Sequence, residues 1–392
     1  MIQLLVLFII LTLSTNLSIL FKKKTFETIP FTLLSIVLIL YIFGLIGILK
    51  IGIYFIILVT IISLINIFLN YKNKNIKNDL FLNYQTLFFI LFFLLMMCSS
   101  WSKLLFEWDA FTHWGVTVKN MFVLNDFGSS ALANTTIKHY PPAMALFQYF
   151  YSVICGSVKD EYLINAITCF SFSLLMPLFN KIKSNKILPN LLTFLLIIII
   201  PIIYFSNNYY SIYVDAYMGI IFGYLLISYF KGNFDLFNII NICLATIVMI
   251  LTKDIGLIMA LSFFAIAIFD TLIFKNKFKE MTLNSIKEKK YIYLALLSIF
   301  LSIIFAKVSW NLSLQFKLSS ISTDSNLSQM LNFFLGERPY YTSNVMINFI
   351  NYLSDGYFAG TIIRLSFYVT IMILTLVIVY IYGQLKKKID KE

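Results

Sequence analysis

The segment 187–205 reads ILPNLLTFLLIIIIPIIYF and carries no charged residue. A helix that crosses a bilayer needs about 20 predominantly apolar residues, so this segment is long enough to span a membrane. The whole chain has the same character, because 60% of its 392 residues are hydrophobic and only 12% are charged. No soluble domain hides so much apolar surface. The composition therefore predicts an all-α, polytopic membrane protein.

Ten further apolar runs bring the predicted number of transmembrane helices to eleven. These runs are residues 2–21, 30–49, 51–70, 80–100, 161–180, 212–230, 236–252, 255–274, 291–309 and 360–383. The first run has no basic segment before it and no small-residue cleavage site after it, so we interpret it as a retained helix rather than a signal peptide. A twelfth apolar run, 141–156, is short.

The placement of lysine predicts the orientation of these helices, because short cytoplasmic loops are enriched in Lys and Arg. With residues 22–29 inside and the eleven spans alternating, the inside loops hold 20 of the 30 basic residues. If 141–156 also crossed, the lysines of 275–290 and 386–391 would move outside. We therefore expect 141–156 to lie along the outer surface or to dip in and return. The N-terminus is then outside and the C-terminus cytoplasmic, and the net charge of +12 reflects orientation and contact with membrane lipids, with no nucleic-acid partner.

The first long polar segment is Glu107-Trp108-Asp109-Ala110-Phe111-Thr112-His113-Trp114. On a helix over 107–122, one face carries Trp108, Phe111, Trp114, Val118 and Phe122, and another carries Asp109, His113, Thr117 and Asn120. This pattern predicts an amphipathic juxtamembrane helix in the outer interface, with its tryptophans among the headgroups. Its polar face would point to water or to a polar cavity. An ordinary interfacial helix with a solvated polar face explains the pattern equally well.

Four short motifs follow one another along the chain, and the predicted orientation places all four outside. They are Trp108-Asp109-Ala110 with Trp114 and Lys119, Tyr140-Pro141-Pro142 before an apolar run, Tyr213-Val214-Asp215 at the start of a span, and Lys253-Asp254-Ile255-Gly256 at the head of another. This ordered set resembles the bacterial membrane glycosyltransferases of the GT-C fold (PMT-like).

The resemblance covers roughly residues 80–310 and implies a GT-C-like core whose first outer loop is 101–160. Residues 1–79 would be three additional N-terminal helices, and 311–392 an outer loop, the final helix and a basic cytoplasmic tail. Asp254 stands where the family has a longer glutamate, which weakens the argument for a functional role of this residue.

The resemblance implies an inverting transfer of a sugar from a polyprenyl-phosphate donor to a hydroxyl group on a glycan, lipid or protein acceptor. The reaction would take place on the extracytoplasmic face of a bacterial cytoplasmic membrane. It needs a carboxylate that accepts the proton of the hydroxyl, and positive charge or hydrogen-bond donors at the departing phosphate.

The resemblance makes Asp109 the general base and leaves Glu107 as the reserve carboxylate. On a helix the two would point about 200° apart, so they are not expected to form a pair. His113 lies one turn from Asp109. One interpretation gives His113 a functional role, either to orient Asp109 or to bind the acceptor. The other makes it a plain interfacial polar residue, and both interpretations stay open.

The first candidates for binding the departing phosphate are Lys253, Arg338 and His139, because cationic donors suit phosphate oxygens. Lys119 and Lys138 are secondary candidates. Tyr140, Asp215 and Asp254 complete the predicted substrate-binding set. An aromatic belt at the membrane interface is the alternative for the tyrosine-rich stretch before Asp215.

No cofactor is certain from the sequence. A divalent cation, Mg²⁺ or Mn²⁺, would find oxygen ligands in Asp109 and Asp215, although no ligand spacing demands one. Four scattered cysteines and two histidines predict neither a zinc site nor a disulfide framework.

Two other classes of function stay open. A polysaccharide polymerase or ligase of the O-antigen type would also be polytopic with a large outer loop, but such proteins rely on outer-loop arginines and only Arg338 fits. A lipid or glycan transporter would carry charges deep within its spans and internal inverted repeats. The charges found here, such as Asp270 and Lys307, lie near the ends of the predicted spans.

Overall fold

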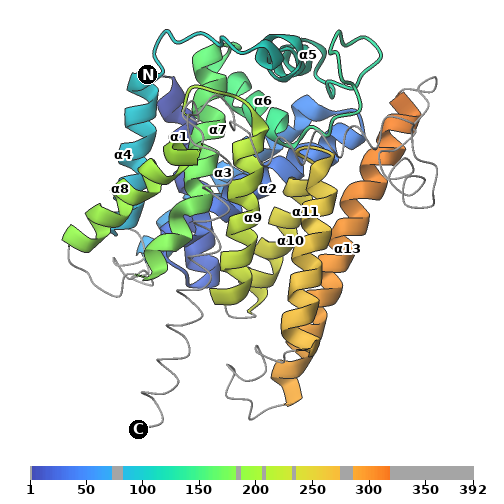
Figure 1. Cartoon of the computed structure of the whole chain (residues 1–392). Coiled ribbons are helices and arrows are strands. Elements are labelled where there is room, and N and C mark those ends of the chain that lie inside the picture. Colours follow the sequence, from blue (N-terminus) through green and yellow to red (C-terminus); the bar gives the residue numbers. More distant parts are fainter. Residues whose placement is uncertain are drawn as a thin grey trace, which may run out of the picture. The chain divides into compact units, whose positions relative to one another are not determined.

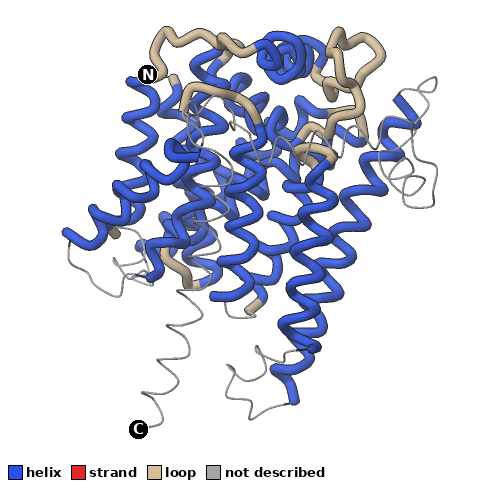
Figure 2. The backbone as a smooth tube through the Cα atoms, viewed as in Figure 1, coloured by secondary structure: helices blue, strands red, loops and turns tan. Residues whose placement is uncertain are grey.

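The structure is a computed structural model, and it describes residues 2–72, 83–181, 187–204, 209–231, 235–273 and 286–317. All of these belong to one compact unit, residues 1–321. In this part of the chain the regular secondary structure is entirely helical (Figure 2). The predicted span at 360–383 lies outside the described residues.

The helices follow one another in chain order and are labelled in Figure 1. They are α1 (Gln3–Phe21), α2 (Thr25–Leu45), α3 (Leu49–Lys72), α4 (Tyr84–Ser99), the π-helix η2 (Ala110–Trp114), α5 (Gly115–Leu124), α6 (Ala143–Cys155), α7 (Asp160–Leu175), the 3₁₀ helix η3 (Met176–Lys181), α8 (Ile187–Tyr204), α9 (Val214–Lys231), α10 (Leu236–Ile250), α11 (Ile255–Ile268), the π-helix η4 (Phe269–Ile273) and α13 (Ile286–Lys317).

Five of the described helices are long and apolar enough to cross a membrane by length and composition: α1, α2, α3, the span that begins with α7, and α13. The described part of the chain adds six shorter apolar helices. Burial separates central from peripheral helices, since 83% of the most apolar window is buried in the α7 span and only 28% in α3. The exposed apolar side chains of α3 have the character of a lipid-facing surface.

The start of α2 differs from the sequence prediction. The helix begins at Thr25 rather than at residue 30, with Pro30 inside it. The backbone N–H of Lys24 donates to the Glu27 carboxylate at 3.1 Å, so Glu27 caps the first turn from its third position. This polar cap adds a turn that a search for apolar residues does not detect.

Helix α6 accounts for the short apolar run at 141–156. Its side chains from Ala143 to Ser152 are all buried, including the polar Gln148, whose amide donates to the Leu163 carbonyl at 3.1 Å. At its start Ala143 N–H donates to the Leu251 carbonyl at 2.6 Å, beside the end of α10. At its end Gly156 adopts a left-handed conformation (φ 77°) and turns the chain into α7.

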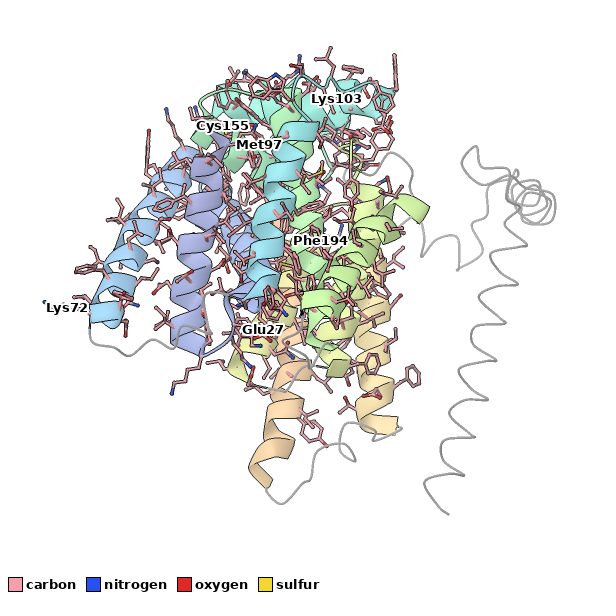
Figure 3. The ribbon with its side chains drawn as sticks, turned by 90° about the vertical axis from the view of Figure 1, so that its left-hand side faces the viewer. Glu27, Lys72, Met97, Lys103, Cys155 and Phe194 are labelled. Atoms are coloured by element: carbon pink, nitrogen blue, oxygen red, sulfur yellow. The ribbon has the colours of Figure 1, made fainter. Side chains whose placement is uncertain are left out.

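Helix α5 lies across one end of the bundle, at the top of Figure 1, and we call this the α5 end. Figure 2 shows the longer described loops gathered there. In Figure 3 Lys103 and Cys155 lie at this end, whereas Lys72 and Glu27 lie towards the opposite one. The opposite end also holds the ion pair between Lys23 and Asp235, whose Nζ and Oδ2 atoms are 2.6 Å apart.

Candidate functional site

A cluster of polar and aromatic side chains lies at the α5 end of the bundle. Four separate segments contribute to it: residues 107–114, 139–140, 211–215 and 253–254. They come from the start of α5, the loop before α6, the start of α9 and the turn between α10 and α11. We call these residues the polar cluster.

The two carboxylates of the first segment are anchored to the start of α9. Ser211 Oγ donates a hydrogen bond to Glu107 Oε2, and the backbone N–H of Asp109 donates to Tyr213 Oη at 3.3 Å. Glu107 lies before the helix rather than on it, so the angle predicted between the two side chains does not apply.

These carboxylates have different surroundings. Asp109 is exposed, whereas Glu107 is half-buried. Burial raises the pKa of Glu107 above its ordinary value, the hydrogen bond from Ser211 opposes this rise, and the negative charge of Asp109 adds to it. The geometry thus provides one exposed carboxylate and, two residues before it, a half-buried carboxylate whose pKa is raised.

His113 is a buried member of the polar cluster, with 5% of its surface exposed. Its ring packs edge-to-face against Tyr140 and Trp114, with centroids 5.1 and 4.7 Å away, and Nδ1 has no hydrogen-bond partner. Burial lowers the pKa of His113 to about 4. The neighbouring His139 and Lys253 add to this decrease in the pKa, and the negative charge of Asp109 opposes it. The imidazole is therefore neutral at physiological pH.

The predicted helix over 107–122 contains a π-turn, which the periodicity of the sequence does not indicate. The N–H of Gly115 donates to the Ala110 carbonyl, which closes a wider ring than an α-helix does. A Cβ atom on residue 115 would lie 2.7 Å from that carbonyl oxygen, so the turn requires glycine. The extra residue shifts the faces of the helix. His113, Thr117 and Val118 are all buried, and the two predicted faces are not kept apart.

One ion pair and one contact between a histidine and a carboxylate complete the polar cluster. Lys253 Nζ lies 2.7 Å from Asp215 Oδ1, and His139 Nε2 lies 3.6 Å from Asp254 Oδ2. The carbonyl of His139 accepts a hydrogen bond from Trp310 Nε1 at 3.0 Å, which fixes this loop to α13. Lys253 and Asp215, for which separate roles were predicted, thus form a pair.

The structure brings together eight of the ten predicted site residues: Glu107, Asp109, His113, His139, Tyr140, Asp215, Lys253 and Asp254. Lys119 is exposed, about 200° around α5 from the buried Thr117, and is not brought to the cluster. Lys138 donates to the Ala131 carbonyl at 3.1 Å. Arg338 lies outside the described residues.

Three contacts of the polar cluster were not predicted: those made by Ser211, by the hydroxyl of Tyr213 and by Trp310. Each joins segments more than a hundred residues apart, and no spacing in the sequence indicates such a pairing. Among the described residues, no group of three or more His, Cys, Asp or Glu side chains could hold a metal ion.

Comparisons with family models, with curated proteins and with solved structures found no match to this chain. The described residues define a structural class of protein. It is a helical bundle with apolar spans and with a cluster of carboxylates, histidines and aromatic rings at one end.

Proposed function

We propose that the protein is a membrane glycosyltransferase that moves a sugar from a polyprenyl-phosphate donor to a hydroxyl acceptor on the outer face of a bacterial cytoplasmic membrane. One observation carries the proposal. The four motifs that resemble the GT-C enzymes are spread over 107–256, and residues of all four meet in the polar cluster through direct contacts.

The proposed orientation has eleven spans, the N-terminus outside and the polar cluster outside. Ten of these spans correspond to described helices. Lys72 and Glu27, which follows the lysines at 22–24 in the chain, lie towards the end opposite the cluster, which fits a cytoplasmic face rich in lysine (Figure 3). Both ends of α6 lie beside outer segments, since Ala143 bonds to Leu251 and the residues after Gly156 lead to Asp160 and Glu161, which bind 102–105.

In the proposed reaction the acceptor oxygen forms a bond to the anomeric carbon while the bond from that carbon to the phosphate oxygen breaks. The hydroxyl proton passes to a carboxylate, and polyprenyl phosphate leaves with the bonding electrons. Asp109 suits the role of base because its carboxylate is exposed and accessible. Glu107 suits it less, because one of its oxygens is already bound by Ser211.

Lys253 is the cation best placed for the departing phosphate. Its Nζ atom is paired with Asp215 at the edge of the cluster, and a phosphate group would compete with that carboxylate for it. His113 is held neutral between Tyr140 and Trp114, so we assign it to orientation of the acceptor or of Asp109 rather than to charge stabilisation.

The test is mass spectrometry of surface glycans and glycolipids from cells that contain or lack this protein. We expect a sugar unit that is present only with the protein, together with accumulation of the charged polyprenyl-phosphate donor in its absence. Identical glycans and identical donor pools in the two strains would contradict the proposal.

A further inference from the structure

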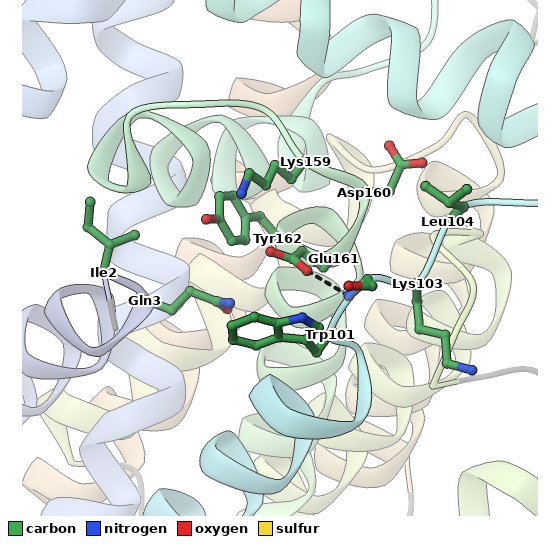
Figure 4. A pocket seen from close by; sticks show the side chains of 10 residues that line it. Ile2, Gln3, Trp101, Lys103, Leu104, Lys159, Asp160, Glu161 and Tyr162 are labelled. Carbon is green, nitrogen blue, oxygen red and sulfur yellow. Dashed lines mark hydrogen bonds between the residues drawn. The ribbon is translucent and has the colours of Figure 1, made fainter.

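A polar cavity separate from the polar cluster lies at the α5 end, between the start of α1, the end of α4 and the start of α7 (Figure 4). It encloses about 490 Å³, within the range of small-molecule sites. Its walls are formed by Ile2 and Gln3 of the N-terminal helix, the segment 101–104, and the segment 159–162. None of these residues belongs to the polar cluster.

Gln3 supplies a side-chain amide to this cavity, and 6% of the residue's surface is exposed. Its Oε1 atom accepts from Tyr151 Oη at 2.6 Å and from Asn165 Nδ2 at 2.7 Å. Asn165 Oδ1 in turn accepts from Ser100 Oγ at 2.8 Å. These bonds fix the amide so that Nε2 has no partner among the described residues, and in Figure 4 the end of the side chain points towards Trp101. Nε2 is not among the buried polar atoms that lack a partner, so this amide nitrogen is accessible and can donate to a ligand or to water.

Each acidic residue of the cavity accepts a backbone hydrogen bond through one of its two carboxylate oxygens. Ser102 N–H donates to Glu161 Oε2 at 2.9 Å, drawn as a dashed line in Figure 4, and Leu105 N–H donates to Asp160 Oδ2 at 3.1 Å. Each carboxylate keeps a second oxygen that can accept from a hydroxyl group.

The charges that line the cavity balance. Lys103 and Lys159 offset Asp160 and Glu161, and the lysines lie over tyrosine rings, Lys159 over Tyr162 and Lys103 over Tyr210, each 5.4 Å from the ring centroid. The four charged side chains on the lining thus carry no net charge, and a neutral ligand with hydroxyl groups can bond to them without adding one.

Trp101 supplies the apolar surface. It is 71% exposed although it lines the cavity, so its indole face is open to a partner. An indole face, a fixed amide donor and free carboxylate oxygens together match the C–H face and the hydroxyl groups of a sugar ring.

We propose that this cavity binds a neutral pyranoside, stacked on Trp101 and hydrogen-bonded to Gln3, Asp160 and Glu161. Because Ile2 and Gln3 come from α1, the added N-terminal helices then serve to complete a carbohydrate site. The proposal goes beyond the transfer reaction and does not depend on it.

The test measures binding to the full chain in lipid nanodiscs. Methyl β-D-glucopyranoside, methyl β-D-galactopyranoside and N-acetyl-D-glucosamine are titrated separately by saturation-transfer-difference NMR, with glycerol 3-phosphate as the anionic comparator. We expect saturable binding of at least one neutral sugar and none of glycerol 3-phosphate. Absence of binding by all three sugars, or binding of glycerol 3-phosphate alone, overturns the proposal.

Two variants localise the site. Trp101→Ala should abolish binding without unfolding the protein, since the side chain is largely exposed. Gln3→Ala should weaken binding about tenfold, the effect of one lost hydrogen bond to a ligand. Gln85→Ala is the matched control, because Gln85 is also buried but bonds to Asn190 away from the cavity. Unchanged binding in Trp101→Ala would contradict the site.

A third variant separates this proposal from the proposed function. Asp109→Asn should retain sugar binding in the cavity even though we expect it to lose transfer. If Asp109→Asn loses binding in this assay and Trp101→Ala does not, the sugar binds in the polar cluster and the cavity proposal fails.

Discussion

The backbone N–H of Asp109 donates a hydrogen bond of 3.3 Å to the hydroxyl of Tyr213, which follows it by 104 residues in the chain. Two residues earlier on each segment, Ser211 donates to Glu107. These two bonds hold the acidic segment against the start of α9, and so bring Asp109 to the same end of the bundle as Asp215 and Lys253.

The π-turn should depend on Gly115. A Cβ atom at this position would meet the Ala110 carbonyl oxygen at 2.7 Å, and backbone cannot move aside cheaply. We expect Gly115→Ala to lower the free energy of unfolding by about 1–3 kcal/mol, measured as a lower melting temperature in detergent. Gly219→Ala is the control, because nothing lies within 4 Å of a Cβ atom there. Equal melting temperatures for the two variants would contradict the steric account.

The ion pair between Lys253 and Asp215 should matter for donor use more than for stability. The lysine and aspartate side chains are 24% and 58% exposed, and exposed pairs contribute at most about 1 kcal/mol. We expect Lys253→Gln to raise the KM for the polyprenyl-phosphate donor while the melting temperature changes little. Lys50→Gln, at an exposed lysine in α3, is the control and should alter neither quantity. A normal donor KM in Lys253→Gln would remove the lysine from phosphate binding.

His113 should make the protein less stable in acid. Its pKa is lowered to about 4 in the folded state, so between the ordinary value of 6.5 and about 4 the unfolded chain binds more protons. Stability is therefore fully present above pH 6.5 and falls as the pH drops through this window. The lowered pKa of His113 corresponds to a loss of folding stability of at most about 3 kcal/mol in acid.

The measurement is the melting temperature of the wild type and of His113→Gln from pH 7 to pH 4. The wild type should lose more stability than the variant over this range. Lys119→Gln serves as the control, since Lys119 is exposed on α5 away from the cluster and its loss should leave the acid dependence intact. If His113→Gln and wild type lose stability equally, the imidazole is not held neutral by burial.

The orientation can be checked with single cysteines in a Cys98→Ser background, which removes the exposed native thiol. Leu132, 82% exposed in the loop after α5, and Lys72, exposed at the end of α3, are replaced by cysteine in turn. We expect an impermeant maleimide added to intact cells to label position 132 at once and position 72 only after permeabilisation. The reverse labelling pattern would show that the topology is opposite to the proposed one.

Much of the helical pattern could be predicted from the sequence, because spans of apolar residues depend on local composition. Every predicted span within the described residues has a helix, and the errors lie at the ends, as at Thr25, where the Glu27 cap extends α2. The π-turn at Gly115 was not predictable from periodicity, since one extra residue in a turn changes which side chains face inward without changing the composition.

The members of the polar cluster could be named from short motifs, but their pairing could not. Lys253 and Asp215 were assigned separate roles, and Ser211 was not identified at all. The buried amide of Gln3, which lies in an apolar run, gave no signal of its own, because its partners Tyr151 and Asn165 are far away in the chain. Such contacts depend on how the helices pack.

The central claim is that Asp109 is the base of a lipid-dependent sugar transfer, and one comparison tests it most directly. Transfer from a polyprenyl-phosphate sugar is measured in membranes that contain wild type, Asp109→Asn or Asp126→Asn. Asp126 is a half-buried aspartate at the same end that pairs with Lys317 outside the cluster. We predict that Asp109→Asn lowers the rate roughly 10²–10⁴-fold, while its melting temperature and the activity of Asp126→Asn stay near wild type. A fully active Asp109→Asn would contradict the account.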